Sequence, residues 1–268
     1  MIRWLARHKI FVIAIFNVVL WLLLLPTFVS TEHQLPLGII FELLMLYLSF
    51  RLANHFRKLM RRKAVEAYHY ACDPYPLEAA AREQLAYVRF ASARTGLQLD
   101  LSTALHATGR NVEAVQILES LHIESIAIPT IVKLVYYNNL VAIYMNMGKL
   151  ELVPELLQKQ GTLLIRLRAN EWTRRIYATY YRLAQAKYQV CRKEYEAAFP
   201  LLEELDIQDL YLPGAVGMSL LKARILIETD RFDAAKPHLE FVLEHGNKLH
   251  AAELARRYLA GHDFVSEV

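Results

Sequence analysis

Few residues of this chain have the types and spacing that catalysis or metal binding requires. The densest group is His238-x-Glu240, followed by Glu244-His245 and, further on, His250. His238 and His245 could share one face of a helix and together bind a metal ion. Two exposed histidines are more often solvated than ligated, so we expect no metal site. An enzyme with a metal site at these two histidines remains an alternative.

Enzyme motifs are missing from the sequence. It contains no glycine-rich phosphate loop, no His-Glu-x-x-His, no Cys-x-x-Cys and no Gly-x-Ser-x-Gly. Its two cysteines, Cys72 and Cys191, provide no disulfide framework, which agrees with a reducing compartment. We therefore expect a protein that is not an enzyme and that binds no cofactor.

A second set of polar residues could recognise another protein. Its members are His106, Asn138, Asn146, Lys187 and Arg224, spread over four apolar segments. If these segments are helices that stack side by side, the residues would lie on one concave surface, where amide and cationic groups suit an extended peptide or a partner helix. The same residues could be ordinary solvated side chains, and the two interpretations stay open.

A basic cluster follows the first part of the chain. It consists of Arg57, Lys58, Arg61, Arg62 and Lys63, and it carries much of the net charge of +4. Such a cluster could bind nucleic acid, but its position directly after an apolar stretch gives a simpler explanation. Basic residues at a membrane interface fix orientation and attract anionic headgroups. We expect membrane-interface anchors and no nucleic acid.

The apolar stretch before this cluster contains no Lys or Arg from Ile10 to Phe50. A polar link, Ser30–Pro36, divides it. The first part, 10–29, is long enough to span a bilayer, for which about 20 residues are needed. Its length and the second apolar run argue against a cleaved signal peptide. The sequence therefore predicts a transmembrane hairpin with helices at about 10–29 and 37–53.

The second of these helices is less regular than the first. It contains Glu42 near its entering end, and it needs Leu52 and Ala53 to reach across. A re-entrant or interfacial segment is the alternative. Because both flanks of the hairpin are basic and the link is not, we expect a multi-pass protein of the cell membrane whose N-terminus and residues 54–268 are cytoplasmic.

The remaining chain, 54–268, has the pattern of a helical domain. Apolar residues recur at three- and four-residue spacing, as in Leu140, Tyr144 and Met147, and strand patterns are nearly absent. Similar segments begin at Tyr75, Gly109, Gly148, Lys193 and Asp230. Each contains a small residue five positions in, and these residues are Ala80, Ala114, Val153, Ala198 and Ala235. A small residue there allows two helices to approach closely, which predicts stacked helical hairpins.

The best of these units resembles the tetratricopeptide repeat family. The residues that carry the resemblance are Tyr137-x-x-Leu140-Val141-x-x-Tyr144 on a first helix, Gly148 at the turn, and Val153 and Leu157 on a second helix. The resemblance covers roughly residues 64–242. It implies an all-α fold, an α-solenoid of hairpins over 54–268, with a capping helix at about 250–260. It also implies a groove lined by the first helices.

The chain departs from the family pattern in three respects. The steps between the later small residues are longer and uneven, and Pro154, Pro200 and Pro237 fall about a turn inside second helices. Some members of the family clamp a peptide carboxylate with polar groups in the groove. Leu99 and Ala184 stand where such a clamp would need polar groups, so we predict none.

Another candidate surface is the aromatic and basic segment from Trp172 to Leu183. We expect Tyr180 and Leu183 to lie inside and the arginines of this segment to lie outside.

Taken together, the sequence predicts a membrane-anchored scaffold that binds a protein or peptide partner at the cytoplasmic face. The alternative is an accessory subunit of a membrane transporter or synthase complex, which the hairpin would contact through Asn17 and Glu42. The sequence identifies neither the partner nor the oligomeric state.

Overall fold

The chain is helical throughout the residues that its computed structural model describes, which are 15, 19, 35–89, 91–124 and 128–261. No residue in these ranges belongs to a strand, as the sequence predicts. The chain divides into two compact units, Met1–Lys63 and Ala64–Val268. The sequence pattern alone sets this boundary earlier, after residue 53. Every buried hydrophobic cluster of the described residues lies in the second unit.

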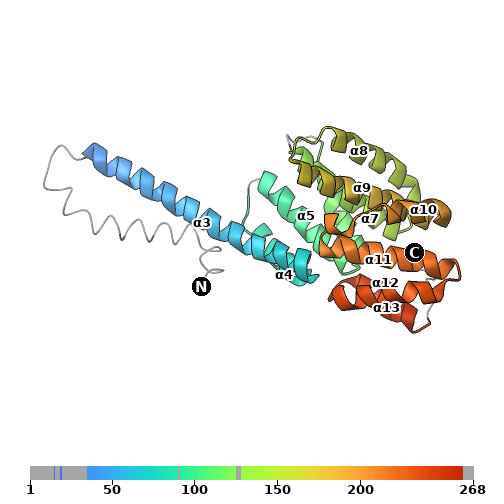
Figure 1. Ribbon diagram of the computed structural model, residues 1–268. Coiled ribbons are helices and arrows are strands. Elements are labelled where there is room, and N and C mark those ends of the chain that lie inside the picture. Colours follow the sequence, from blue (N-terminus) through green and yellow to red (C-terminus); the bar gives the residue numbers. More distant parts are fainter. Residues whose placement is uncertain (1–14, 16–18, 20–34, 90, 125–127, 262–268) are drawn as a thin grey trace. The chain divides into compact units, whose positions relative to one another are not determined.

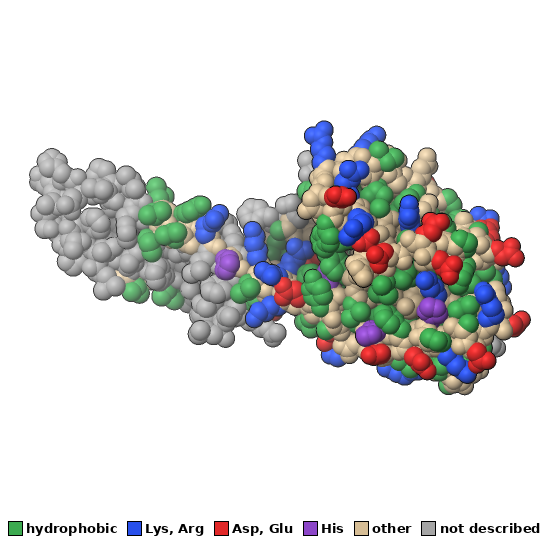
Figure 2. Space-filling model, in the orientation of Figure 1, with side chains coloured by type: hydrophobic (Ala, Val, Ile, Leu, Met, Phe, Trp, Pro, Cys, Tyr) green, Lys and Arg blue, Asp and Glu red, His purple; other side chains and the backbone are tan. Residues whose placement is uncertain are grey.

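The first unit contains the apolar stretch. The expected span at 10–29 lies outside the described residues except for Ile15 and Val19, whereas the second, at 37–53, lies in α3 (Leu35–Ala71). Several apolar side chains of α3 are exposed, among them Leu43 (62%) and Tyr47 (55%). Figure 2 shows hydrophobic side chains on the surface of the described part of this segment. No helix in the described part of the chain is both long enough and apolar enough to cross a membrane.

The second unit consists of helical hairpins. The end of α3 packs on α4 (Tyr75–Leu85) through Ala64 and Leu77. The later pairs are α5 (Ala91–Ala107) with α6 (Asn111–Glu119), α7 (Thr130–Asn146) with α8 (Val153–Ile165), α9 (Glu171–Cys191) with α10 (Tyr195–Glu203), and α11 (Leu212–Glu228) with α12 (Phe232–His245). Two 3₁₀ turns, η1 (Leu150–Leu152) and η2 (Ile207–Asp209), lie between helices, and α13 (His250–Leu259) ends the described chain.

The hairpins stack in the manner of an α-solenoid. We call α5, α7, α9 and α11, each of which begins a hairpin, the first helices, and their partners the second helices. Among the first helices, α5 packs on α7, α7 on α9 and α9 on α11. The second helices pack against them as another layer, and α13 packs on α12 and α11 (Figure 1). Acidic and basic side chains are interspersed over the face of this unit that Figure 2 shows.

Small residues control the spacing inside each hairpin. Ala114, Val153, Ala198 and Ala235 are completely buried, and each is followed four residues later by a buried leucine. The first of the five repeated segments differs from the prediction, because Ala80 is only half-buried and Ala81 takes the buried place. The buried apolar residues of α4, which begins at Tyr75, are Leu77 and Ala81.

The turn inside each hairpin is built in the same way. Gly109, Gly148, Lys193 and Asp230 all have positive φ, from 57° at Asp230 to 81° at Gly109. The amide after each of them bonds back to a carbonyl in the last turn of the first helix, as from Glu194 N to Gln189 O at 2.9 Å. This is the Schellman arrangement that satisfies the end of a helix. Each turn residue precedes the buried small residue by five positions.

The three prolines are accommodated in two ways. Pro154 stands at the start of α8, because the 3₁₀ turn η1 precedes that helix and delays it. Pro200 and Pro237 lie inside α10 and α12, as the sequence predicts. Each of these two helices therefore lacks one backbone hydrogen bond near its start.

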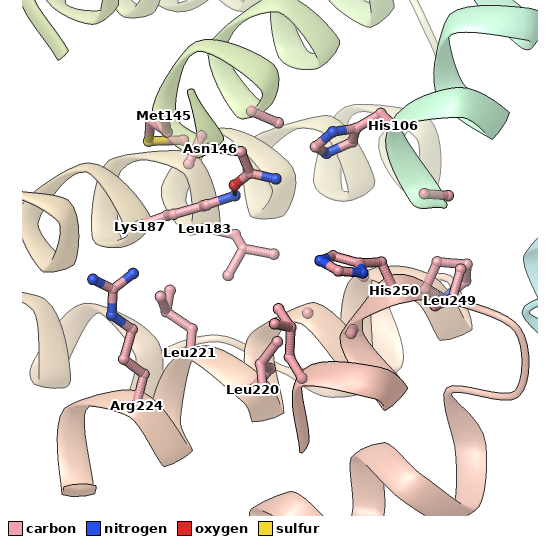
Figure 3. Close-up of a pocket in the computed structure, with 18 of the residues that line it drawn as sticks. His106, Met145, Asn146, Leu183, Lys187, Leu220, Leu221, Arg224, Leu249 and His250 are labelled. Carbon is pink, nitrogen blue, oxygen red and sulfur yellow. Dashed lines mark hydrogen bonds between the residues drawn. The ribbon is translucent and has the colours of Figure 1, made fainter. Parts of the chain in front are cut away.

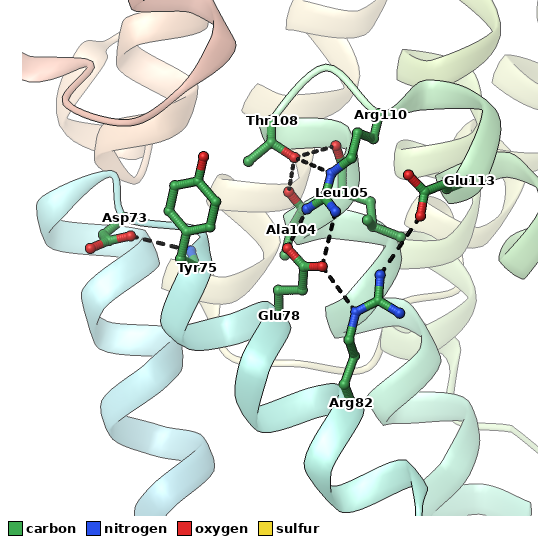
Figure 4. A network of polar contacts seen from close by, with 9 residues as sticks. All are labelled: Asp73, Tyr75, Glu78, Arg82, Ala104, Leu105, Thr108, Arg110 and Glu113. Carbon is green, nitrogen blue, oxygen red and sulfur yellow. Dashed lines mark hydrogen bonds and ion pairs between the residues drawn. The ribbon is translucent and has the colours of Figure 1, made fainter.

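A polar network joins α4 to the α5–α6 turn (Figure 4). Arg110 forms a two-pronged ion pair with Glu78, and Arg82 donates from Nε to the same carboxylate at 2.9 Å. The hydrogen bond from Arg110 is the main reason that the pKa of Glu78 lies below its usual value. The network fixes the α5–α6 turn against α4.

The second unit closes on itself, because the α12–α13 connection meets the α3–α4 junction. Asn247 Nδ2 donates to the carbonyl of Ala71 at 2.7 Å, and Lys248 Nζ pairs with Asp73 at 2.6 Å. Below these contacts, Cys72 is buried among residues of α11, α12 and α13. The first helices therefore enclose a central space.

Candidate functional site: a polar cavity among the first helices

The first helices enclose a cavity of about 1080 Å³ in the second unit. Each helix contributes residues spaced about one turn apart, so that a single face of it lines the space. On α7 these residues include Asn138, Ala142 and Asn146, and on α9 they include Tyr180, Ala184, Lys187 and Cys191. Its volume is in the range of sites for small ligands and short peptide segments.

All five residues that the sequence marks as partner-binding candidates line this one cavity. His106 comes from α5, Asn138 and Asn146 from α7, Lys187 from α9 and Arg224 from α11. Figure 3 shows four of them, His106, Asn146, Lys187 and Arg224, arranged around the open space. Five positions scattered over more than a hundred residues of sequence therefore converge in space.

Lys187 is the most unusual group of the cavity. Its Nζ donates to Asn146 Oδ1 at 2.5 Å, and among the described residues it has no carboxylate as an ion-pair partner. Burial is the main reason that its pKa is lowered; the nearby Cys191 thiol acts in the opposite direction, and the positive charge of Arg224 lowers the pKa further. A cation held largely out of water by a neutral amide costs free energy, so this position is unfavourable for stability unless an anion joins it.

The cavity as a whole has a positive lining. Lys187, Lys193, Arg224 and Arg257 contribute cationic groups. Arg257 is paired with Glu253 at 2.7 Å. Among the described lining residues, the acidic side chains are Glu228 and Asp230, at and just after the C-terminal end of α11. The region around Lys187 and Arg224 therefore favours a negatively charged group of a ligand.

His106 is held in its neutral form. Burial lowers its pKa to about 4, and the nearby charge of Lys187 acts in the same direction. Its Nδ1 lies 2.7 Å from Asn111 Oδ1, so Nδ1 carries the proton and donates to that oxygen. The imidazole thus offers Nε2 as an acceptor.

The asparagines of α7 are tied to the scaffold. Asn138 Oδ1 accepts from Gln160 Nε2 at 3.4 Å, and Asn139 Nδ2 donates to Thr103 Oγ1 at 2.7 Å. These bonds fix the amide groups at one side of the cavity. The apolar part of the lining includes Leu183, Leu220 and Leu221, so a ligand would meet both apolar surface and polar groups.

Sequence reasoning missed the contribution of α13. The structure places His250 in the lining, and its ring lies so close to Gly109 that a Cβ added at Gly109 would be 3.0 Å from it. The sequence predicts α13 only as a cap, because the closure of the unit depends on the curvature of the whole array. No local pattern reveals that curvature.

The other predicted residues lie elsewhere. Lys58, Arg61, Arg62 and Lys63 are exposed on α3, whereas for Arg57 only the helical backbone is described. Leu99 is buried in the core, and of these described residues only Ala184 lines the cavity.

The α9 helix agrees with the prediction in part. Its exposed arginines are Arg174, Arg175 and Arg182, as expected. Tyr180 and Leu183 are half-buried and face the cavity rather than the core between helices.

The histidines considered as metal ligands do not form a site in the described residues, where no three His, Cys, Asp or Glu side chains are grouped closely enough to hold a metal ion. His238 and His245 do not line the cavity, whereas His250 does. The pKa of His238 is lowered by burial and by nearby Lys222, which favours a neutral imidazole.

Comparison with protein-family models, with curated proteins and with solved structures finds no match for this chain.

Proposed function

We propose that this protein is a membrane-anchored helical-repeat scaffold that binds a protein or peptide partner in the cavity of residues 64–268. The observation that carries this proposal is the convergence of His106, Asn138, Asn146, Lys187 and Arg224 on one cavity. A partner that places a carboxylate beside Lys187 would neutralise a cation that has no carboxylate partner among the described residues. An extended peptide segment with an acidic side chain or a free C-terminus has this chemistry.

The membrane anchor is part of the same proposal. It is supported by the absence of Lys and Arg from Ile10 to Phe50 and by the basic cluster that follows. The exposed apolar side chains of α3, such as Leu43 and Leu44, also favour contact with lipid or with another apolar surface. In this arrangement the N-terminus and residues 54–268 are cytoplasmic, and the partner is bound at that face.

Site-specific photo-crosslinking of the full chain in native membranes tests the cavity. A photo-reactive phenylalanine analogue at Ala142 would lie in the lining, whereas the same analogue at Ala197, an exposed residue of α10, serves as the matched control. We expect a reproducible protein or peptide product from position 142 alone. Equal products from both positions, or none from position 142, would contradict the proposal.

The alternative role, as an accessory subunit that acts through the hairpin, has its own test. Exchange of residues 1–53 for an unrelated transmembrane hairpin should leave the crosslink at Ala142 in place if the cavity binds the partner. Loss of function with an intact crosslink would favour the accessory role instead.

The orientation is testable separately. A cysteine introduced at exposed Ala197 should react with an impermeant reagent only after intact cells are permeabilised. Labelling before permeabilisation would overturn the cytoplasmic placement.

A further inference from the structure

The corner between α8 and α9 exposes large apolar side chains to an unusual degree. Ile165, at the end of α8, is 84% exposed, and Trp172, at the start of α9, is 54% exposed. Neither residue lines the central cavity. A tryptophan with its ring partly in water is typical of the interface between membrane and water.

The same corner is strongly basic. Arg166, Arg168 and Arg174 are exposed, and none of the three has a hydrogen bond or ion pair from its side chain among the described residues. Arg175 is paired with Asp209 at 2.7 Å. Within residues 165–175 the only acidic residue is Glu171, so the segment carries a clear positive excess.

This corner is ordered by contacts of its own. Leu167 is 6% exposed and anchors the connection in the interior. Asn170 caps α9, since its Oδ1 accepts from the amide of Thr173 at 2.8 Å. The ring of Trp172 stands edge-on to that of Tyr211, with the centroids 6.5 Å apart. The exposed Ile165 and Trp172 therefore sit on a fixed corner.

We propose that this corner, residues 165–174, is a docking surface for an anionic lipid bilayer. Its two exposed apolar side chains would enter the interfacial region, while Arg166, Arg168 and Arg174 would contact lipid phosphates and carboxylates. Exposed apolar side chains beside arginines that have no acidic partner among the described residues complement a surface that is anionic outside and apolar beneath, which is the chemistry of a bilayer with acidic headgroups. A bilayer needs only a few inserted side chains and complementary charge, so a lipid surface is the occupant that fits.

The fluorescence of Trp172 in the full chain provides the test. Trp4→Phe and Trp21→Phe leave Trp172 as the only tryptophan. This chain is reconstituted in lipid nanodiscs of phosphatidylcholine, with and without phosphatidylserine, each containing brominated acyl chains as quenchers. We expect quenching of Trp172 in the discs with phosphatidylserine, and its loss at high salt or in phosphatidylcholine alone.

Charge reversal locates the effect. Arg166→Glu with Arg168→Glu and Arg174→Glu should shift the docking equilibrium by at least about 100-fold, since each arginine contributes about fivefold. The matched control, Lys222→Glu with Lys236→Glu and Arg256→Glu, makes the same change of charge on α11, α12 and α13. The control should dock as the parent chain does.

Three results would overturn the proposal. These are no quenching in either lipid, equal loss of quenching in the control, or quenching that does not depend on phosphatidylserine and salt. If the triple variant unfolds in a circular-dichroism melt, the lipid and salt dependence of the parent chain still decides the question. Because the corner is separate from the cavity, its failure would leave crosslinking at Ala142 unchanged.

Discussion

The two sides of the first helices differ in what they bury. Toward the second helices they meet small and apolar residues, such as Ala198 and Leu202, which are completely buried. Toward the cavity the same helices carry Asn146, Lys187 and Arg224, and the half-buried Lys187 is bonded to an amide. Packing on the first side stabilises the fold. On the second side the desolvated charge of Lys187 reduces stability, and a bound anionic group would offset that loss. This contrast supports the proposal that the cavity is the binding site.

The contrast predicts that truncations on the two sides have unequal effects. Leu239→Ala should reduce the free energy of unfolding by about 3 kcal/mol, because Leu239 is completely buried between hairpins and its loss leaves a void. Leu220→Ala, at a half-buried residue of the cavity lining, should cost less than about 1 kcal/mol. Chemical denaturation of the two variants measures both values. Equal losses would show that the cavity side is packed as tightly as the hairpin side.

The second prediction concerns pH and His106. Its pKa in the folded protein is about 4, compared with 6.5 ordinarily, so the unfolded chain takes up a proton first as the pH falls. Stability from this residue is fully present above pH 6.5 and is lost as the pH falls toward about 4. The slope is about 1.4 kcal/mol per pH unit within this window, so the total loss is about 3 kcal/mol.

His106→Gln removes this titration. The difference in unfolding free energy between the parent chain and this variant should therefore vary with pH only within that window. A constant difference would place His106 in an environment open to water.

The third prediction is that Lys187→Met stabilises the unliganded protein. Methionine removes a desolvated charge and keeps an unbranched apolar side chain, so we expect a gain of about 1 to 2 kcal/mol. The change should appear as a higher midpoint in urea, measured without ligand. A loss of stability would mean that Lys187 serves the fold rather than a ligand.

The smallest expected effect concerns the turns. Lys193 adopts a φ of 63°, which is unfavourable for a residue with a Cβ, and its side chain is exposed. Lys193→Gly should stabilise the protein by about 0.5 to 1 kcal/mol, whereas Lys193→Ala should not. Thermal melts of the two variants check this difference, and a gain for both would mean that charge, not backbone strain, decides it.

Much of the second unit could be predicted from its sequence. The hairpin positions follow from local chemistry, because a left-handed turn residue, a small residue five positions later and a leucine one turn further on recur together. The cavity candidates could be identified for a related reason, since one face of each first helix carries the polar residues.

The closure of the array could not be predicted. It depends on long-range contacts such as that between Asn247 and the carbonyl of Ala71, which are far apart in sequence. Without these contacts neither His250 nor Tyr258 would be expected in the lining. The shift from Ala80 to Ala81 was also missed, because the sequence does not show that the turn residue is Cys72, which has a positive φ of 49°.

The most direct test of the binding cavity is the yield of the photo-crosslink from Ala142 in full-length protein in native membranes. We predict that Lys187→Met reduces this yield at least tenfold, because a charged hydrogen bond to the partner contributes about 1.5 to 3 kcal/mol. Lys222→Met, at a lysine of α11 that does not line the cavity, should leave the yield unchanged. An unchanged yield in Lys187→Met would contradict the account.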